Sequence, residues 1–406
     1  MTVGQGINKI TVFKAQTGLG VPASGSGGQI LRRRTSVLDR KRATFVNDEI
    51  VQHQQSTGVN LATATTDWAY DGLLSPGTFA RLMEALLRKT YTAGVATSGL
   101  SVTIAGSAPI FTLTRSAGSY LTDGYKIGDV VRITAGTYTN GANRDNNLLV
   151  TGLTATVLTC IVVNATALIP EGPISGSTIS VIGKKSMPPL TGHTDTLFTI
   201  EDWYADLSRS ELFPDMRIAQ ADVGLPASGN ATVKLGGMGL GVRTLSGTQV
   251  LTSPIAATVA PVLTAVRGAV LVNGSQVVTI TGASFTVKAN MTAEGPIMGS
   301  NYAPDMSRGR IEVSGQITGL FDAATLVTLY DAETVTSMVA LLTADNTNAA
   351  DFVSFNISAM KLTGSTPDDG EKAIVRTYPF TAQLNAAGGA ALANDQTIIS
   401  VQDSLA

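Results

Sequence analysis

Gly72-Leu73-Leu74-Ser75-Pro76-Gly77-Thr78-Phe79-Ala80-Arg81-Leu82 has a counterpart later in the chain, Gly319-Leu320-Phe321-Asp322-Ala323-Ala324-Thr325-Leu326-Val327-Thr328-Leu329. The two stretches lie 247 residues apart, from Gly72 to Gly319, and both begin with a glycine and two apolar residues. Each then offers an N-cap candidate, Ser75 or Asp322, whose side-chain oxygen can accept a hydrogen bond from a free helix N–H. Pro76 fits the first helical position. Apolar residues at helical spacing follow, so one short amphipathic helix is predicted in each stretch.

The sequence on either side of these stretches also repeats. Strand-like runs precede both predicted helices, at residues 43–70 and 286–318, and strand-like runs follow at 199–204 and 353–360. A Pro-Asp pair predicted to lie in a loop comes after each of the later runs, at Pro214 and Pro367. The second offset is 153 residues, so the first copy is predicted to contain 94 extra residues (247 − 153) between its helix and its next strand.

The extra residues form a segment of distinct composition. Residues 94–189 are rich in Gly, Thr and Val, and residues 123–133 read as a turn feeding a strand, which is typical of small β-barrels of the SH3-like or OB kind. The predicted fold is therefore mainly β, with two tandem β-sandwich domains, each flanked by a short helix, and an inserted small barrel. The predicted boundaries are an N-terminal arm (1–34), copy one (35–93 and 190–245), the insert (94–189), a linker (246–263) and copy two (264–406).

Composition excludes several classes of function. The 406 residues are only 14% charged and carry a net charge of −2, which gives no global reason to bind nucleic acid. Cys160, the single cysteine, cannot form an internal disulfide and is expected to be a buried strand residue. Two histidines exclude a His-rich metal site. The N-terminus lacks a signal-peptide core and no run of about 18 apolar residues occurs. The expectation is a protein made in the cytosol without a membrane span.

The motifs that could carry chemistry do not converge. Glu201 and Asp202 point to opposite faces of a strand, so with Asp206 they are expected to be surface acids beside two buried aromatics, Trp203 and Tyr204. Gly236-Gly237-Met238-Gly239-Leu240-Gly241 lacks the Lys-Ser/Thr ending of a phosphate loop and favours a strand end or close packing. Neither His53 nor His193 lies near a nucleophile motif. The sequence therefore predicts no enzyme, and no catalytic, cofactor-binding or metal-binding residue.

Two basic runs, Arg32-Arg33-Arg34 and Arg40-Lys41-Arg42, allow two interpretations. A nucleic-acid patch is one. The other, which we favour because no aromatic residues interleave for base stacking, is a charged arm that pairs with acidic surface of this chain or of a neighbour.

Several stretches taken together resemble the major tail tube proteins of siphophages, in their tandem-duplicated type. The resemblance covers nearly the whole chain outside the insert, and no single motif is diagnostic. It rests on an ordered set of stretches: Gln16 to Gly28 with Leu31-Arg32-Arg33, Asn47-Asp48-Glu49-Ile50, Leu74-Ser75-Pro76-Gly77 with the helix to Arg88, Thr292-Ala293-Glu294, Gly299-Ser300-Asn301 and Asp368-Asp369-Gly370-Glu371-Lys372. The chain differs from many relatives in its inserted barrel and in having no room after Phe380 for an immunoglobulin-like domain.

The resemblance implies a structural virion protein of the phage tail, assembled in the host cytoplasm. Its sheets would join those of neighbours into stacked rings around a lumen that holds the tape-measure protein and passes double-stranded DNA during ejection. Tail terminator and distal tail proteins would be further partners. Two copies per chain predict a trimeric, pseudo-hexameric ring, with a hexamer of chains as the alternative. The insert is expected outside the bore. A different virion structural protein, or a receptor- or carbohydrate-binding β protein, is the alternative function.

Overall fold

One antiparallel sheet of eight strand positions runs through the middle of the molecule, and we call it the central sheet. The computed structural model describes residues 3–163, 166–321, 325–368 and 373–406. The order across the sheet is β3–β4–β15–β14–β19–β22–β26–β24, and β25 continues the edge strand β24. The bounds are β3 (Thr35–Val46), β4 (Val59–Leu73), β15 (Thr232–Gly239), β14 (Arg209–Pro226), β19 (Ile280–Lys288), β22 (Glu312–Leu320), β26 (Val375–Ala382), β24 (Phe352–Leu362) and β25 (Thr366–Pro367).

Two outer sheets pack behind the central sheet, and β14 and β24 each run from an outer sheet into the central one. The first outer sheet contains β2 (Gln29–Ile30), β1 (Lys9–Ala15), β13 (Phe198–Tyr204), the first half of β14, and β16 (Thr244–Ser246). The second contains β18 (Ser275–Gln276), β17 (Gly268–Val272), β23 (Thr336–Thr343), the first half of β24, β27 (Ser400–Asp403), β12 (Lys184–Ser186) and β5 (Thr92–Ala93). Part of the predicted arm, β1, is therefore a strand in which Val12 and Phe13 are buried.

The core follows from alternation along these strands. In β22, Val313 and Ile317 are buried while Glu312 and Gln316 are exposed, as the two-residue periodicity predicts. The inward side chains of the central and outer sheets merge into one cluster that includes Trp68, Phe213, Phe285 and Phe355. A mainly β, layered architecture is confirmed.

Helix α1 (Ala80–Leu87) lies against β14, and α3 (Thr325–Asp331) lies against β24. The predicted start of the first helix was wrong. Gly77 has a φ of 70°, which an α-helix cannot contain, so Ser75 and Thr78 form a separate turn with their side-chain oxygens 2.6 Å apart. The N-cap residue is Phe79, which makes no side-chain capping bond. The predicted cap Asp322 and the stretch from Asp369 to Lys372 lie outside the described residues.

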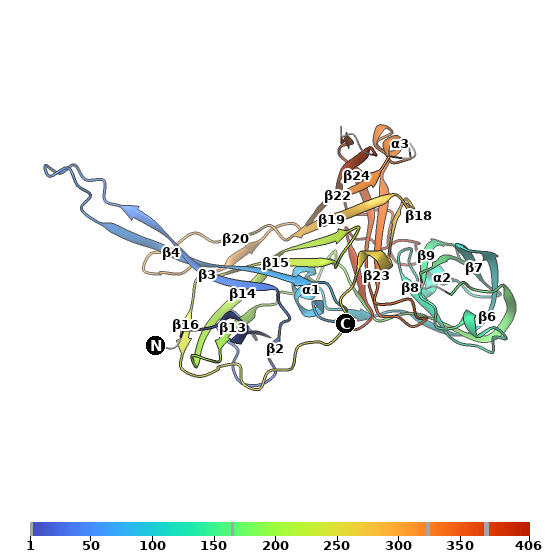
Figure 1. Cartoon of the computed structure of the whole chain (residues 1–406), viewed down its shortest axis with the longest axis horizontal. Coiled ribbons are helices and arrows are strands. Elements are labelled where there is room, and N and C mark those ends of the chain that lie inside the picture. Colours follow the sequence, from blue (N-terminus) through green and yellow to red (C-terminus); the bar gives the residue numbers. More distant parts are fainter. Residues whose placement is uncertain (1–2, 164–165, 322–324, 369–372) are drawn as a thin grey trace.

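The predicted inserted barrel is present and closed. Its strands run in the order β10–β7–β6–β11–β8–β9, and it lies at the opposite end of the molecule from the tip of the β3–β4 hairpin (Figure 1). The bounds are β6 (Ala96–Ser107), β7 (Ile110–Arg115), α2 (Tyr120–Asp123), β8 (Val130–Ala135), β9 (Leu148–Leu153), β10 (Val157–Val162) and β11 (Glu171–Val181). The chain enters and leaves the barrel side by side, because Thr92 and Ala93 pair with Lys185 and Lys184. Short 3₁₀ helices complete the fold at Gly6–Asn8, Gly141–Asn143 and Ala265–Arg267.

The barrel is anchored to the second outer sheet by apolar and polar contacts. Val130, Leu149 and Ile161 of the barrel pack with residues of β17, β23 and β24. Gln402 of β27 accepts the Val130 N–H and donates to the carbonyls of Val130 and Ile182. The barrel is therefore attached to the side of the molecule that lies behind the central sheet.

The two halves of the central sheet have the same strand registers. Thr35 pairs with Asp71 in the β3–β4 hairpin, and Gly282 pairs with Thr318 in β19–β22, with both partners 247 residues later. The match continues past a bulge: Thr44 pairs with Leu61, and Met291 of β20 (Met291–Ala293) pairs with Arg308 of β21 (Met306–Arg308). We call β3, β4, β15 and β14 the first unit, and β19, β22, β26 and β24–β25 the second unit.

The later strands of the two units also correspond, at a shorter offset. Arg217 and Ile218 of β14 pair with Met238 and Gly237, and Lys361 and Leu362 of β24 pair with Thr381 and Phe380. The offset along β14 and β24 is therefore 144 residues, from Ile218 to Leu362. The predicted match of Pro214 with Pro367 was wrong, because the two prolines lie 153 residues apart and the registers give an offset of 144. The predicted loops are also strands, since Pro214 lies inside β14 and Pro367 inside β25. A bulge in the β13–β14 pairing, where Asp215 has a φ of 56°, lets β14 accommodate a proline.

Candidate assembly surface

The outward face of the central sheet is polar across its whole width. One row of directly paired residues crosses every strand: Thr35, Asp71, Lys234, Asp222, Thr286, Ser314, Thr381 and Lys361. None of these side chains is buried, whereas the alternate residues on the opposite face form the core. Since a half-buried antiparallel sheet has one core face and one solvated face, this face is the free side of the sheet.

The side chains of this face are mostly small. Neighbouring positions hold Ala69, Gly224, Ser284 and Gly236, so the surface is smooth. Acidic and basic residues alternate without a large patch of one sign: Asp39, Asp67, Asp71, Asp222 and Glu312 lie on the face with Lys41, Lys234, Lys288 and Lys361. Lys41 and Asp67 form an ion pair of 2.7 Å. Such a face offers little for tight binding of a polyanion.

Both outer edges of the central sheet lack a partner strand among the described residues. β3 pairs only with β4, and residues 364–368 run beside β26 alone. Unpaired strand edges present N–H and C=O groups that favour pairing with another chain. One carbonyl of the β3 edge, that of Ser36, accepts a hydrogen bond of 2.8 Å from the Lys9 ammonium.

The two units meet inside the chain by pairing of β14 with β19. Seven residue pairs join them, from Gln220 with Lys288 to Pro226 with Gly282. Across this internal junction the Thr286 hydroxyl donates to the Asp222 carboxylate at 2.6 Å. Asp222 also accepts from the Gln220 side-chain amide at 2.7 Å. The internal junction is thus a complete edge-to-edge joint of the kind that the two outer edges lack.

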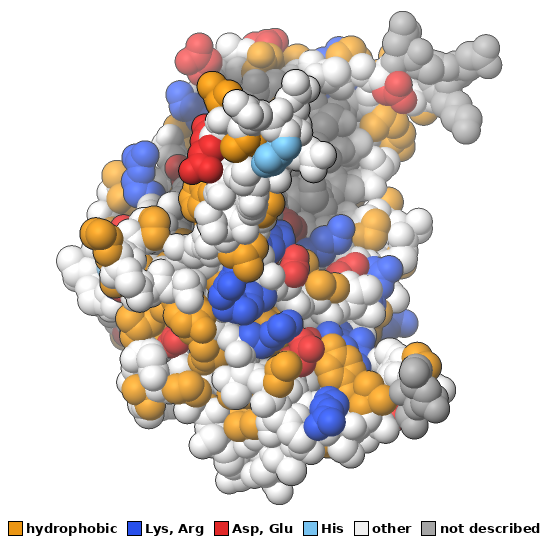
Figure 2. Space-filling view, turned by 90° about the vertical axis from the view of Figure 1, so that its left-hand side faces the viewer, with side chains coloured by type: hydrophobic (Ala, Val, Ile, Leu, Met, Phe, Trp, Pro, Cys, Tyr) orange, Lys and Arg blue, Asp and Glu red, His pale blue; other side chains and the backbone are white. Residues whose placement is uncertain are grey.

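Each unit extends one hairpin beyond the sheet. The first arm (residues 43–62) projects freely and exposes Phe45, Val46, Ile50 and Leu61 (Figure 1). The second arm (residues 289–311) instead lies against the first unit, where the Ala64 N–H donates to the Asn301 carbonyl at 2.9 Å. Figure 2 looks onto this end of the molecule and shows Lys and Arg side chains gathered near its centre.

The basic runs make contacts within the chain. Arg32 donates to the Ala260 carbonyl at 2.6 Å and Arg33 to the Gly6 carbonyl at 3.0 Å. Arg40 donates to the Gly241 carbonyl at 2.5 Å and stacks on the ring of Tyr302 of the second arm, 5.7 Å from its centroid. The runs therefore make contacts within the chain, mostly with backbone carbonyls. Two pairs involve acids, as predicted: Lys41 with Asp67 at 2.7 Å and Arg34 with Asp71 at 3.8 Å.

The acids of β13 are not surface residues, which corrects the prediction. Glu201 and Asp202 are both buried, whereas Trp203 and Tyr204 are half-exposed. Glu201 accepts hydrogen bonds from the backbone N–H groups of Val250 and Leu251, both at 2.7 Å. Asp202 pairs with Lys9 at 2.6 Å, and the Thr11 hydroxyl donates to it at 2.7 Å. Asp206 accepts the Gln5 N–H at 2.7 Å. The three acids anchor chain segments and share no site.

The remaining candidates have structural surroundings. Gly239 belongs to β15, where a Cβ would come within 2.3 Å of the Met216 sulfur, so close packing explains it. His53 lies on the exposed first arm and His193 in an exposed loop. Cys160 is fully buried in β10, and burial raises the pKa of its thiol to about 12. In the described part of the chain, no three His, Cys, Asp or Glu side chains are grouped to hold a metal ion.

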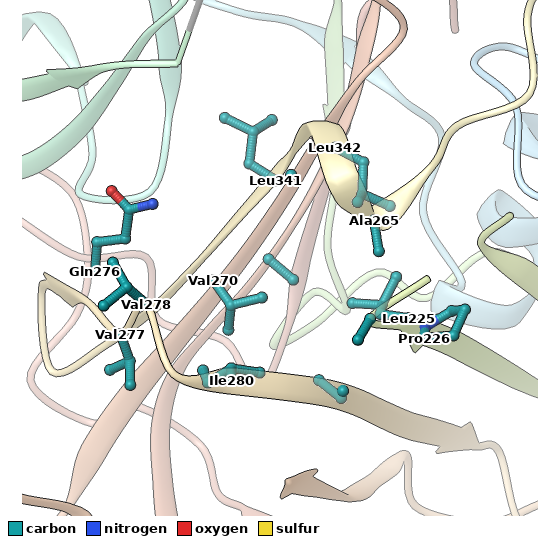
Figure 3. Close-up of a pocket in the computed structure, with 15 residues that line it drawn as sticks. Leu225, Pro226, Ala265, Val270, Gln276, Val277, Val278, Ile280, Leu341 and Leu342 are labelled. Carbon is teal, nitrogen blue, oxygen red and sulfur yellow. The ribbon is translucent and has the colours of Figure 1, made fainter. Parts of the chain in front are cut away.

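A pocket of about 240 Å³ lies where β14 ends beside β17, β18 and β19 (Figure 3). Leu225, Val270, Val277, Ile280 and Leu342 line it, and its lining includes no titratable side chain. A cavity with this lining has no group for acid–base or nucleophilic chemistry. It is a gap behind the internal junction.

Asp403 fastens the C-terminal strand to the turn before α1. Its carboxylate, only 4% exposed, accepts the Gly77 N–H at 2.8 Å and the Leu405 N–H at 2.9 Å. Burial raises the pKa of this carboxyl to about 6, although both backbone bonds act to lower it. Near neutral pH the Asp403 carboxylate is therefore ionised in an environment that disfavours its charge, which lowers the stability of the fold.

This raised pKa predicts a pH-dependent stability. An unfolded aspartate has a pKa of about 3.9, so between pH 4 and pH 6 the folded protein binds more protons than the unfolded chain. The free energy of unfolding should then fall as the pH rises through this window, by roughly 3 kcal/mol at most. The variant Asp403→Asn should lack this fall. Urea unfolding of the wild-type chain and of the variant across this pH range, at protein concentrations too low for polymerisation, measures the difference. A constant difference between them from pH 4 to pH 7 would contradict the expectation.

Among the described residues, the central sheet combines a polar face, two unpaired edges and one freely projecting arm, features that favour association with further chains. The family model described as phage tail tube protein matches residues 6–382. The chain therefore belongs to the phage tail tube protein family, and it is a structural component of the virion tail that assembles into a tube. A comparison with curated proteins gave no significant match. No helix in the described ranges is both long and apolar enough to cross a membrane.

Proposed function

We propose that this chain polymerises into stacked rings that form the hollow tail tube through which the phage DNA is ejected, with the polar face of the central sheet lining the bore. The observation that carries the proposal is the central sheet itself: two units of matching register, joined edge to edge, with an open edge at each end. A head-to-tail contact between such edges produces a closed ring when the rotation from one chain to the next is a whole fraction of a full turn. The arms and the outer sheets then provide contacts between rings.

The matching registers support a tandem duplication of the tube domain, with the predicted boundaries 35–93 plus 190–245 for the first copy and 264–406 for the second. If the usual ring contains six tube domains, three chains complete it, and a ring of six chains is the alternative. Residues 246–263 cross between the copies, held by Glu201 at Val250 and Leu251.

The lining suits a conduit. Small polar side chains and alternating charges leave few sites at which phosphates would be held by released counterions. Double-stranded DNA and, before it, the tape-measure protein are the proposed occupants of the bore. The ends of the tube would meet the tail terminator and the distal tail proteins. The whole assembly would form in the host cytoplasm without a membrane step.

The barrel is proposed to decorate the outside of the tube, because it is attached behind the central sheet, away from the polar face. We predict that a short epitope inserted in the β6–β7 turn, at Ala108, leaves tube formation unchanged. Antibody–gold in electron micrographs should then label the outer wall along the full length of the tube. Loss of assembly, or tubes that bind no antibody until they are broken open, would contradict an exterior position.

Electron microscopy of the purified full-length chain tests the proposed function. Hollow polymers of uniform width and variable length are the expected result. A protein that remains a monomer at all concentrations, or that forms closed particles of fixed size, would overturn the proposal. The proposed occupancy of the bore by the tape-measure protein can then be tested by adding that protein during polymerisation. If it binds in the bore, the tubes should stop growing at a fixed length.

A further inference from the structure

We infer that neighbouring chains join through pairing of β3 with residues 364–368 of a second copy, in the register of the internal junction, so that Asp39 of one chain faces Thr366 of the next. The inference rests on the proposed function, because it specifies the contact by which the ring would close. The internal junction is its template, since the same two kinds of edge already meet there within one chain.

The register follows from the two offsets. In the internal junction Thr286 of β19 pairs with Asp222 of β14. The residue 247 positions before Thr286 is Asp39 of β3, and the residue 144 positions after Asp222 is Thr366 of β25. The same shifts place Val37 opposite Asp368 and Lys41 opposite Gly364. All of these positions are exposed or half-exposed.

The side chains at the centre of the two junctions are complementary in the same way, with their places exchanged. In the internal junction the second-unit residue Thr286 donates its hydroxyl to the first-unit residue Asp222. In the external junction the threonine is Thr366 and the aspartate is Asp39. Cross-strand pairs of this kind stabilise a sheet. Both Asp39 and Thr366 are exposed in the single chain and free to form this bond.

The backbone groups of the two edges also fit, with one exception. Asp368 donates its N–H to Val375 of β26, so the alternate residue Pro367 turns its backbone groups toward the open edge. Proline has no N–H, and this joint therefore has one donor fewer than the internal one. Asp39 and Thr366 would then form a pair without mutual backbone bonds, the arrangement in which opposing side chains are closest. Ser36, whose carbonyl accepts a hydrogen bond from Lys9, lies one residue beyond the stretch 37–41 that the joint pairs, so this bond can remain.

The positions of the arms agree with this joint. The second arm rests on the first unit through Asn301 and Ala64. The residue 247 positions after Ala64 is Ile311, which directly precedes β22 of the second unit. In the ring, Ile311 of the neighbouring chain would support the first arm in the same way. The exposed apolar residues Phe45, Val46 and Ile50 of the first arm would be covered in that way.

Disulfide trapping in preformed tubes tests the register. Opposed Cβ atoms in a sheet lie about 4.5–5.5 Å apart and diagonal ones about 7–8 Å apart, beyond the reach of a disulfide without backbone movement. The variant Asp39→Cys with Thr366→Cys, and independently Val37→Cys with Asp368→Cys, should form chain-to-chain disulfides on mild oxidation. The diagonal variant Asp39→Cys with Asp368→Cys is the matched control. Cys160 is buried and unreactive, so the wild-type chain gives the background.

The expected result is covalent oligomers in most of the chains of both opposed variants, and a yield at least about tenfold lower in the control. Tubes that form without disulfides in the opposed variants, or with more in the diagonal control, would overturn the inferred joint and leave the proposed function standing. Failure of the wild-type chain to form tubes at all would instead overturn the proposed function.

Discussion

Thr366→Asp should raise the critical concentration for tube formation by about tenfold or more. The substitution places a carboxylate directly opposite Asp39 of the neighbouring chain, where the inferred joint needs a hydroxyl donor. Like charges directly opposed in a sheet are unfavourable, and at an interface they cost roughly 1–2 kcal/mol or more per joint. Because 1.4 kcal/mol corresponds to a tenfold change in an equilibrium constant, pelleting assays across a dilution series will resolve the effect.

Restoration by exchange makes this prediction specific. Asp39→Thr combined with Thr366→Asp recreates the arrangement of the internal junction, in which the aspartate lies on the strand equivalent to β25. The double variant should polymerise at close to the wild-type concentration. Thr381→Asp adds the same charge to the same face, beside Lys361 and away from either edge, and should assemble normally. Equal impairment of the double variant and Thr366→Asp would show that the two residues do not face each other.

Lys185→Met should lower the free energy of unfolding by about 3–5 kcal/mol, because it removes the partner of two buried carboxylates. The Lys185 ammonium lies 2.5 Å from Asp129 of the barrel and 2.5 Å from Asp395 near the C-terminus. All three side chains are nearly inaccessible to water. Burial acts to lower the pKa of the Lys185 ammonium, but the two carboxylates outweigh it and hold that pKa above its ordinary value. Without the ammonium, two buried carboxylates would face each other unpaired at the point where the barrel joins the second outer sheet.

Lys184→Met provides the matched control for this prediction, because Lys184 is the exposed neighbour on the same strand. It should change stability by no more than about 0.5 kcal/mol. Urea unfolding followed by Trp68 and Trp203 fluorescence measures both variants. In Lys185→Met, hydrogen exchange should also increase along β8 and β12, where the barrel is attached. If Lys185→Met were as stable as Lys184→Met, the charges of Asp129 and Asp395 would have to be neutralised by something other than Lys185, which would contradict the prediction.

The correspondence between the two units could be predicted from sequence where its signal is local. Gly72 and Gly319 each lie near the end of a long strand that is followed by a short helix. Because the local structures are the same, the two segments have similar residues at a fixed offset of 247 positions. The same reasoning failed at Pro214, since a proline at a bulge inside a strand has the local sequence of a loop. It also assigned residues 1–34 to an arm, although β1 within them has three consecutive buried residues and so lacks the simple alternation of a half-buried strand.

The assembly surface could not be predicted from sequence, because it is formed by contacts between residues that lie far apart in the chain. Glu201 and Asp202 were expected at the surface, and they are buried because residues 250–251 and Lys9 cover them from distant parts of the chain. The bond between Asp222 and Thr286 depends on the register of two strands that are not neighbours in sequence. Asp39 and Thr366 correspond to Thr286 and Asp222 of the internal junction, and this correspondence depends on the strand registers of both units.

A cryo-electron microscopy reconstruction of the polymer tests the central claim most directly. The account predicts rings with threefold rotational symmetry, in which six similar units alternate between internal and external joints and the polar face of the central sheet lines the bore. In that map β3 of each chain should run beside residues 364–368 of its neighbour. Six chains per ring, or a bore lined by the barrel or by the outer sheets, would contradict the account.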